Sequence, residues 1–175
     1  MNEQEMWERC KSFHGHECGG LAIGFQASLY AMELLNISFS EDEEIVCISE
    51  NDACGVDAIQ ALLSCTAGKG NLLFHMTGKQ AFSFYDRNSG KSVRLVLRPH
   101  TSESKQASLQ YYRNTDYHEL FDVKETKIIL PKKARIFKSV TCECCGEKTA
   151  ENYIHLENGK MLCPDCYEEY LRPLI

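Results

Sequence analysis

The sequence lacks any hydrophobic run that could cross a membrane, since no segment approaches the roughly 18–20 apolar residues of a spanning helix. Its beginning, MNEQEMWERCKSF, also lacks the apolar region and small-residue cleavage site of a secretory signal. An excess of positive charge is missing as well, because the net charge is −6 and the pI is about 5.5. We therefore expect a cytoplasmic protein with no membrane partner, and we do not expect it to bind nucleic acid.

Cysteine is absent from residues 66–141, although the chain of 175 residues contains ten cysteines. Five precede this gap and five follow it. In a reducing compartment, so many cysteines indicate metal or thiol chemistry before disulfides. Between the two groups lies the basic stretch PKKARIFKSV, which has the composition of a connector. The sequence thus predicts a metal-site domain over 1–130, a basic linker over 131–140 and a zinc-ribbon domain over 141–175.

Hydrophobic periodicity and turn residues predict an α+β fold for the first domain. We expect helices over 1–12, 18–35, 55–65, 102–114 and 116–122, and strands over 44–50, 70–76, 80–86 and 91–98. Asp52 is available as the cap of the third segment with helical spacing, 55–65. Turn residues separate the last three strands, so we expect these strands to form a meander. The core order is then α-β-α-β(3).

The C-terminal cysteines have the spacing of a zinc ribbon or treble clef. Two C-x-x-C pairs are separated by seventeen residues, and they supply four thiols: Cys142, Cys145, Cys163 and Cys166. Four thiolates close the coordination shell of Zn²⁺, so we expect a structural zinc, with a redox C-x-x-C pair or an Fe–S site as alternatives. Asn158-Gly159 predicts a hairpin turn between the pairs, and the final residues YEEYLRPLI predict a short helix.

The N-terminal stretch FHGHECGGLAIG places three ligand-type residues at alternate positions, His14, His16 and Cys18. In an extended segment, such residues point to one side and could converge on one point. If a helix begins at Cys18 instead, the helix N-terminus favours the thiolate of this residue. Either geometry favours metal binding or nucleophilic chemistry, and the two glycines after Cys18 leave room for a ligand.

A second segment, SENDACGVDAIQ, places Cys54 between an expected strand and an expected helix. Side chains in such turns are exposed at a sheet edge, where functional sites are common. Asp52 and Asp57 are the nearest carboxylates that could move a proton or support a ligand. Cys65 lies past the far end of the same helix.

Together, FHGHECGGLAIGFQA, ACGVDAIQALLSCTAGKGNL and the terminal four-cysteine ribbon resemble the FmdE-like family, which is named for the E-subunit of formylmethanofuran dehydrogenase. The resemblance covers nearly the whole chain and implies an FwdE/GAPDH-domain-like core, in agreement with the order of the expected elements. It also implies homodimers and a zinc or other divalent metal at the N-terminal motif. By position, the implied ligands are His16, Cys18 and Cys54, with His14 and Cys65 as further candidates. The family has Cys-Pro-Gly where this chain has Cys-Gly-Gly.

Members of this family accompany a molybdenum or tungsten formylmethanofuran dehydrogenase. The resemblance therefore implies a metal-binding accessory protein, molybdopterin oxidoreductase subunits as partners, and a small-molecule ligand. Two alternatives stay open. The first is a metal-independent thiol enzyme with Cys18 or Cys54 as nucleophile and His14 or His16 as base. The second is a non-catalytic adaptor that uses its zinc ribbon to dock a partner.

Overall fold

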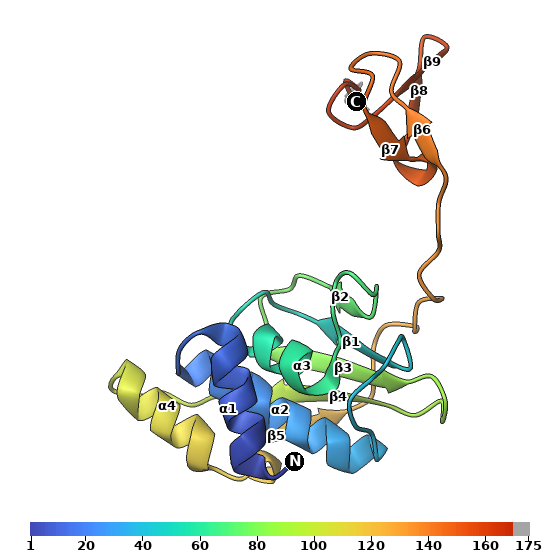
Figure 1. Cartoon of the computed structure of the whole chain (residues 1–175). Helices are drawn as coiled ribbons and strands as arrows, with labels where there is room; N and C mark the ends of the chain where they lie inside the picture. Colours follow the sequence, from blue (N-terminus) through green and yellow to red (C-terminus); the bar gives the residue numbers. More distant parts are fainter. Residues whose placement is uncertain (170–175) are drawn as a thin grey trace, which may run out of the picture. The chain divides into compact units, whose positions relative to one another are not determined.

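The computed structural model describes residues 1–169. The chain forms two compact units, Met1–Ala134 and a second unit that begins at Arg135. No helix in the described part of the chain is long and apolar enough to cross a membrane. The first unit is the larger and carries a five-stranded sheet (Figure 1).

The first unit is an α+β domain, as the sequence predicts. Its helices are α1 Glu3–His14, α2 Gly19–Leu35, α3 Gly55–Leu63, α4 Lys105–Asn114 and α5 Tyr117–Leu120. Its strands are β1 Ile45–Ser49, β2 Leu72–Phe74, β3 Ala81–Asp86, β4 Ser92–Leu97 and β5 Phe121–Lys124. The strand order is β2-β1-β3-β4-β5, in which β1 and β2 are parallel and all other pairs are antiparallel.

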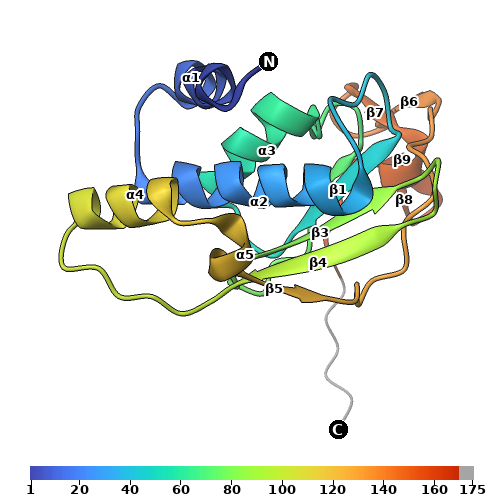
Figure 2. The same ribbon diagram turned by 90° about the horizontal axis from the view of Figure 1, so that it is seen from below.

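Helix α2 is the centre of the hydrophobic core. It is apolar on nearly every side, with Leu21, Ala22 and Phe25 fully buried, and a helix of this kind must be covered all round. The sheet covers one side of α2, and α1, α3 and α4 pack against its other sides (Figure 2). The core fixes the N-terminal end of α2, where the candidate site begins.

The expected meander is only half correct. Strands β3 and β4 form the predicted hairpin, but β2 does not pair with β3. Instead β1 lies between them, with Cys47 opposite both Leu72 of β2 and Phe84 of β3. All five residues of β1 are buried, so this strand takes a neighbour on each side, and α3 is the crossover that makes β2 parallel to it.

Two further expectations are corrected by the structure. The helix expected over 116–122 ends at Leu120, and the chain continues as the edge strand β5 because Phe121 is buried beside β4. Asp52 does not cap α3, whose N-cap residue is Cys54. The side chain of Asn51 makes the local contact instead, by accepting the backbone N–H of Ala53 at 3.0 Å.

The second unit consists of two small hairpins. Strands β6 Ser139–Thr141 and β7 Lys148–Ala150 form the first, and β8 His155–Glu157 and β9 Lys160–Leu162 form the second, after the short helix η1 Glu151–Tyr153. Asn158 and Gly159 both have positive φ, 49° and 79°, which confirms the predicted hairpin turn. Residues 167–169 are not helical, and the rest of the expected terminal helix lies outside the described residues.

Candidate metal centre and ligand cavity

The site is built where two helices begin. Cys18 is the N-cap residue of α2, and Cys54 is the N-cap residue of α3. A Cβ atom placed on Gly20 would lie 3.6 Å from the Cys54 sulfur and 3.8 Å from the Cys18 sulfur. Both thiols therefore border the same backbone position, although they are 36 positions apart in the sequence.

Glycines allow α2 and α3 to touch along their backbones. A Cβ atom on Gly24 would lie 1.9 Å from the carbonyl oxygen of Gly55, which is far inside contact distance. Gly19 likewise lies against Ser108 of α4, whose Oγ would be 2.4 Å from a Cβ at this position. The sequence predicts that Gly19 and Gly20 leave room for a ligand. They do border the cavity described below, but the structure also uses them for close packing.

His14 is held from both sides. It is the last residue of α1, and Gly15, with a φ of 89°, turns the chain away from the helix. Nδ1 of His14 lies 2.7 Å from Oδ2 of Asp57, and Nε2 lies 3.7 Å from the sulfur of Cys18. A carboxylate can only accept, so in a neutral imidazole Nδ1 carries the proton and Nε2 presents its lone pair toward Cys18.

His16 completes a compact group of donors. Its ring centroid lies 4.4 Å from that of His14, and one ligand atom from each of His14, His16 and Cys18 lies within 4.8 Å of the other two. The expected convergence therefore occurs, but not through an extended strand. Cys18 is the N-cap residue of α2, as in the second geometry considered above. The turn at Gly15 brings His14 back toward this thiol.

The structure separates the remaining candidates. Cys54 lies beside Cys18, and burial together with this neighbouring thiol raises the pKa of Cys54. Cys65 is not brought to the group: it is fully buried in the core, where its sulfur contacts the carbonyl of Ile45 at 3.6 Å. Asp52 is exposed and does not line the cavity, whereas Asp57 reaches His14.

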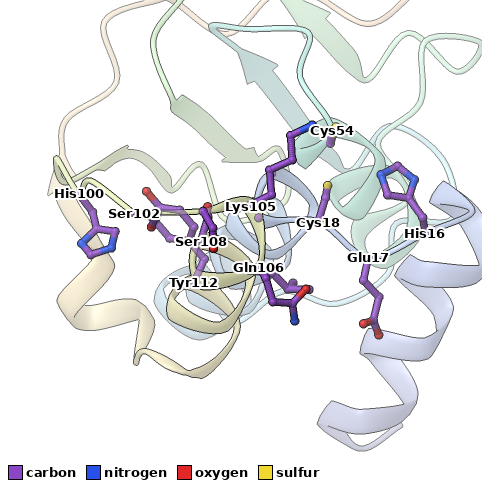
Figure 3. A pocket seen from close by; sticks show the side chains of 14 residues that line it. His16, Glu17, Cys18, Cys54, His100, Ser102, Lys105, Gln106, Ser108 and Tyr112 are labelled. Carbon is purple, nitrogen blue, oxygen red and sulfur yellow. The ribbon is translucent and has the colours of Figure 1, made fainter.

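A cavity of about 770 Å³ opens beside the two cysteines (Figure 3). One end is formed by the residues around Cys18 and Cys54, and the other end by α4 and the segment before it. The lining residues are His16, Glu17, Cys18, Gly19, Gly20, Cys54, His100, Ser102, Ser104, Lys105, Gln106, Ser108, Leu109 and Tyr112. The contribution of α4 is not foreseen from the sequence, because no motif marks these residues. The volume lies within the range of small-molecule sites.

The four ribbon cysteines form a second, separate cluster. The sulfur atoms of Cys142, Cys145, Cys163 and Cys166 all lie within 4.8 Å of one another. The backbone N–H groups of Cys145 and Cys163 point at the Cys142 sulfur and lower the pKa of this thiol to about 6. Tetrahedral zinc with Zn–S bonds of ~2.3 Å needs sulfurs ~3.8 Å apart, close to the 3.9 Å between Cys145 and Cys163. This cluster could hold a metal.

Comparisons with known proteins find relatives of two different descriptions. The curated "Probable S-adenosyl-L-methionine-binding protein" of Archaeoglobus fulgidus is 28% identical over an alignment of 172 positions, which covers 79% of this chain and 47% of that protein. The chain thus spans about half the length of this relative. The crystal structure of a tungsten formylmethanofuran dehydrogenase FmdE-like protein from Syntrophus aciditrophicus is similar, with a TM-score of 0.69 and 25% identity. That match covers 94% of this chain and 91% of the other.

A family profile described as "FmdE, Molybdenum formylmethanofuran dehydrogenase operon" matches residues 13–139. This range holds the whole N-terminal donor group, both helix starts and every residue that lines the cavity. The match covers well over half of the chain, and it agrees with the similarity to the solved FmdE-like protein. The chain belongs to the FmdE family.

Proposed function

We propose that this chain is a zinc-binding accessory protein of a formylmethanofuran dehydrogenase-type oxidoreductase, with a metal and a small ligand bound in its N-terminal unit. One observation carries the proposal: imidazole and thiol donors from His14, His16 and Cys18 converge at the end of a cavity. Nitrogen and sulfur donors of these kinds are the ones that zinc prefers.

The residues fit a metal in a further respect. Histidines that bind metals commonly donate their other ring nitrogen to a carboxylate, which fixes the tautomer and the ring orientation. Asp57 contacts His14 in this way. We propose Cys54 as a further donor, because its sulfur borders Gly20 together with Cys18, although it lies outside the group of three; without it, a ligand from the cavity takes the fourth position on the metal. When bound, the metal supplies Lewis-acid chemistry to a ligand in the cavity. The surrounding residues, such as Asp57, orient these donors.

The ribbon cluster has a different task in this proposal. Four thiolates leave no open position on the metal, so its zinc is structural. Among the described residues of this unit, the buried core consists of Cys142, Leu162 and Cys163, which is too small to stabilise the unit alone. Metal binding then supplies the folding free energy that burial does not.

The proposed context rests on the comparisons. The matching family is named for the formylmethanofuran dehydrogenase operon, and the Syntrophus aciditrophicus protein is described as an FmdE-like protein. We therefore propose molybdopterin oxidoreductase subunits as partners and a homodimer as the assembly. An affinity pulldown from native extract should recover the oxidoreductase subunits. Recovery of the homodimer without oxidoreductase subunits would contradict the accessory role but not the proposed metal site.

The thiol-enzyme alternative is less well supported. The raised pKa of Cys54 keeps this residue a thiol near neutral pH, and the thiol is the weak nucleophile. This alternative predicts about one zinc per chain, in the ribbon, and fast alkylation at Cys18 or Cys54. The adaptor alternative predicts that substitutions at positions 14, 16, 18 and 54 change no activity in the folded protein.

Metal content of purified variants tests the proposal. The wild-type chain should hold about two zinc ions, one in each cluster, and the C18S/C54S variant about one. Cys65→Ala is the matched control, because it removes a thiol from the same unit but from the core, and it should keep both ions. If C18S/C54S remains folded and retains two ions, the N-terminal site is wrong.

A further inference from the structure

The cavity extends beyond the proposed metal site toward a group of hydrogen-bond donors. Helix α4 and the segment before it contribute hydroxyl, amide and ammonium groups from Ser102, Ser104, Lys105, Gln106 and Ser108. In Figure 3, the side chain of Lys105 extends toward Cys54, whereas Ser102, Ser108 and Tyr112 lie nearer to His100. None of these side chains carries a negative charge. The distal end of the cavity therefore offers donors to a ligand.

Tyr112 is an independent sign of a ligand at this end. Its side chain is only 7% exposed, and it lines the cavity. Its hydroxyl group makes no hydrogen bond with any other residue in 1–169, and it is not among the fully enclosed unpaired atoms, so solvent or a ligand can reach it. Burial raises the pKa of Tyr112, which keeps the group an O–H donor. A buried phenol of this kind normally finds a partner.

The charges around the cavity favour an anion. The carboxylate of Glu17 is the only acidic side chain in the lining, and it is already paired with Lys11 at 2.9 Å and with the indole N–H of Trp7 at 3.3 Å. Lys105 takes part in no ion pair among residues 1–169, so its ammonium group is available to a ligand. This local preference exists although the whole chain is acidic.

From these observations, we propose that the α4 end of the cavity binds the oxyanion of a small ligand, a carboxylate or a phosphate, through Lys105 and Tyr112. The hydroxyl groups of Ser102, Ser104 and Ser108 add further donors. The ligand's other end then lies at Cys18 and Cys54, and only this second part rests on the proposed metal site. A carboxylate and a phosphate both present oxygen atoms that accept hydrogen bonds, so the proposal is for an oxyanion of either kind.

Titration of the ¹⁵N-labelled full chain tests the inference, with inorganic phosphate and acetate as separate probes at constant ionic strength. The backbone amides of Lys105, Gln106 and Ser108 should shift in a saturable way with at least one probe. Lys105→Gln should weaken binding about tenfold, the value of one charge-assisted hydrogen bond. Tyr112→Phe removes only the hydroxyl group and should weaken binding while the protein stays folded. Lys91→Gln removes an exposed lysine elsewhere and should have no effect.

Each outcome decides something. A saturable shift with phosphate alone indicates a phosphorylated ligand, and a shift with acetate alone indicates a carboxylate. Shifts that are confined to the amides near Cys18, or that are equal in the wild-type and Lys105→Gln chains, would overturn the inference. The C18S/C54S variant separates the two proposals: it loses N-terminal zinc but should still bind the anion at α4. If the Lys105→Gln variant loses anion binding while its zinc content is unchanged, the result supports the anion site independently of the metal site.

Discussion

Gly24→Ala is the sharpest test of how the fold builds the site. An alanine Cβ at this position would lie 1.9 Å from the carbonyl oxygen of Gly55 and 2.5 Å from its Cα. Ordinary contact begins at 3.4 Å, so α2 and α3 must move apart by ~1.5 Å. Both partners are backbone atoms, and no side-chain rotation can relieve the contact.

Two effects of opposite sign determine the expected change in the free energy of unfolding. Overpacking of this kind costs about 3 kcal/mol, whereas replacing glycine by alanine inside a helix gains about 1 kcal/mol. We expect a net loss of about 2 kcal/mol in the free energy of unfolding, or a decrease in Tm of about 7 °C for a domain of this size. The separation of the helix starts should also lower zinc affinity at the N-terminal site.

Thermal unfolding followed by circular dichroism, with and without a chelator, measures both consequences. Gly68→Ala is the control, because nothing lies within 4 Å of a Cβ at that position. It should change stability by less than about 0.5 kcal/mol. If Gly24→Ala melts at the same temperature as Gly68→Ala, the close crossing of α2 and α3 does not exist as described.

Two other predictions concern the site and the core. Asp57→Asn should weaken zinc binding at the N-terminal site by about 10–100-fold, because it removes the carboxylate that fixes the tautomer of His14. Competition with a chelator measures this, and Gln60→Ala, which removes the other partner of Asp57, should leave the affinity near that of the wild type. In native protein treated with iodoacetamide, Cys10 and Cys65 should stay unmodified, since both are fully buried and burial raises the pKa of each to about 12. The exposed thiol of Cys144 should react, and mass spectrometry of tryptic peptides distinguishes the sites. Modification of Cys65 at the rate of Cys144 would contradict its place in the core.

Features that depend on a few consecutive residues could be predicted from the sequence. The C-x-x-C pairs and the Asn158-Gly159 turn are local, because a short segment places its own side chains through backbone geometry. The α+β class and most helix bounds followed from periodicity for the same reason. His14, His16 and Cys18 also converge, because the first and the last are only four positions apart.

Features that depend on distant pairing could not be predicted in this way. The insertion of β1 between β2 and β3 reflects the need of a fully buried strand for two neighbours, which no single segment reveals. The contact of Asp57 with His14 joins residues 43 positions apart. No motif marks Tyr112 in the sequence, and only the packing of α4 against α2 places this residue in the lining of the cavity.

The packing of α2 against α3 explains the spacing of the motif CGGLAIG. Gly20 lies two positions after Cys18 and touches Cys54, and Gly24 lies one helical turn further and touches Gly55. Residues four apart share a face of a helix, so both glycines face α3. A side chain at Gly24 would force the two helix starts apart, and the thiols with them, whereas a Cβ atom at Gly20 would lie 3.1 Å from the Cβ atom of Cys54. The glycines and the cysteines therefore act as one unit: the backbone contact sets the distance at which Cys18 and Cys54 meet.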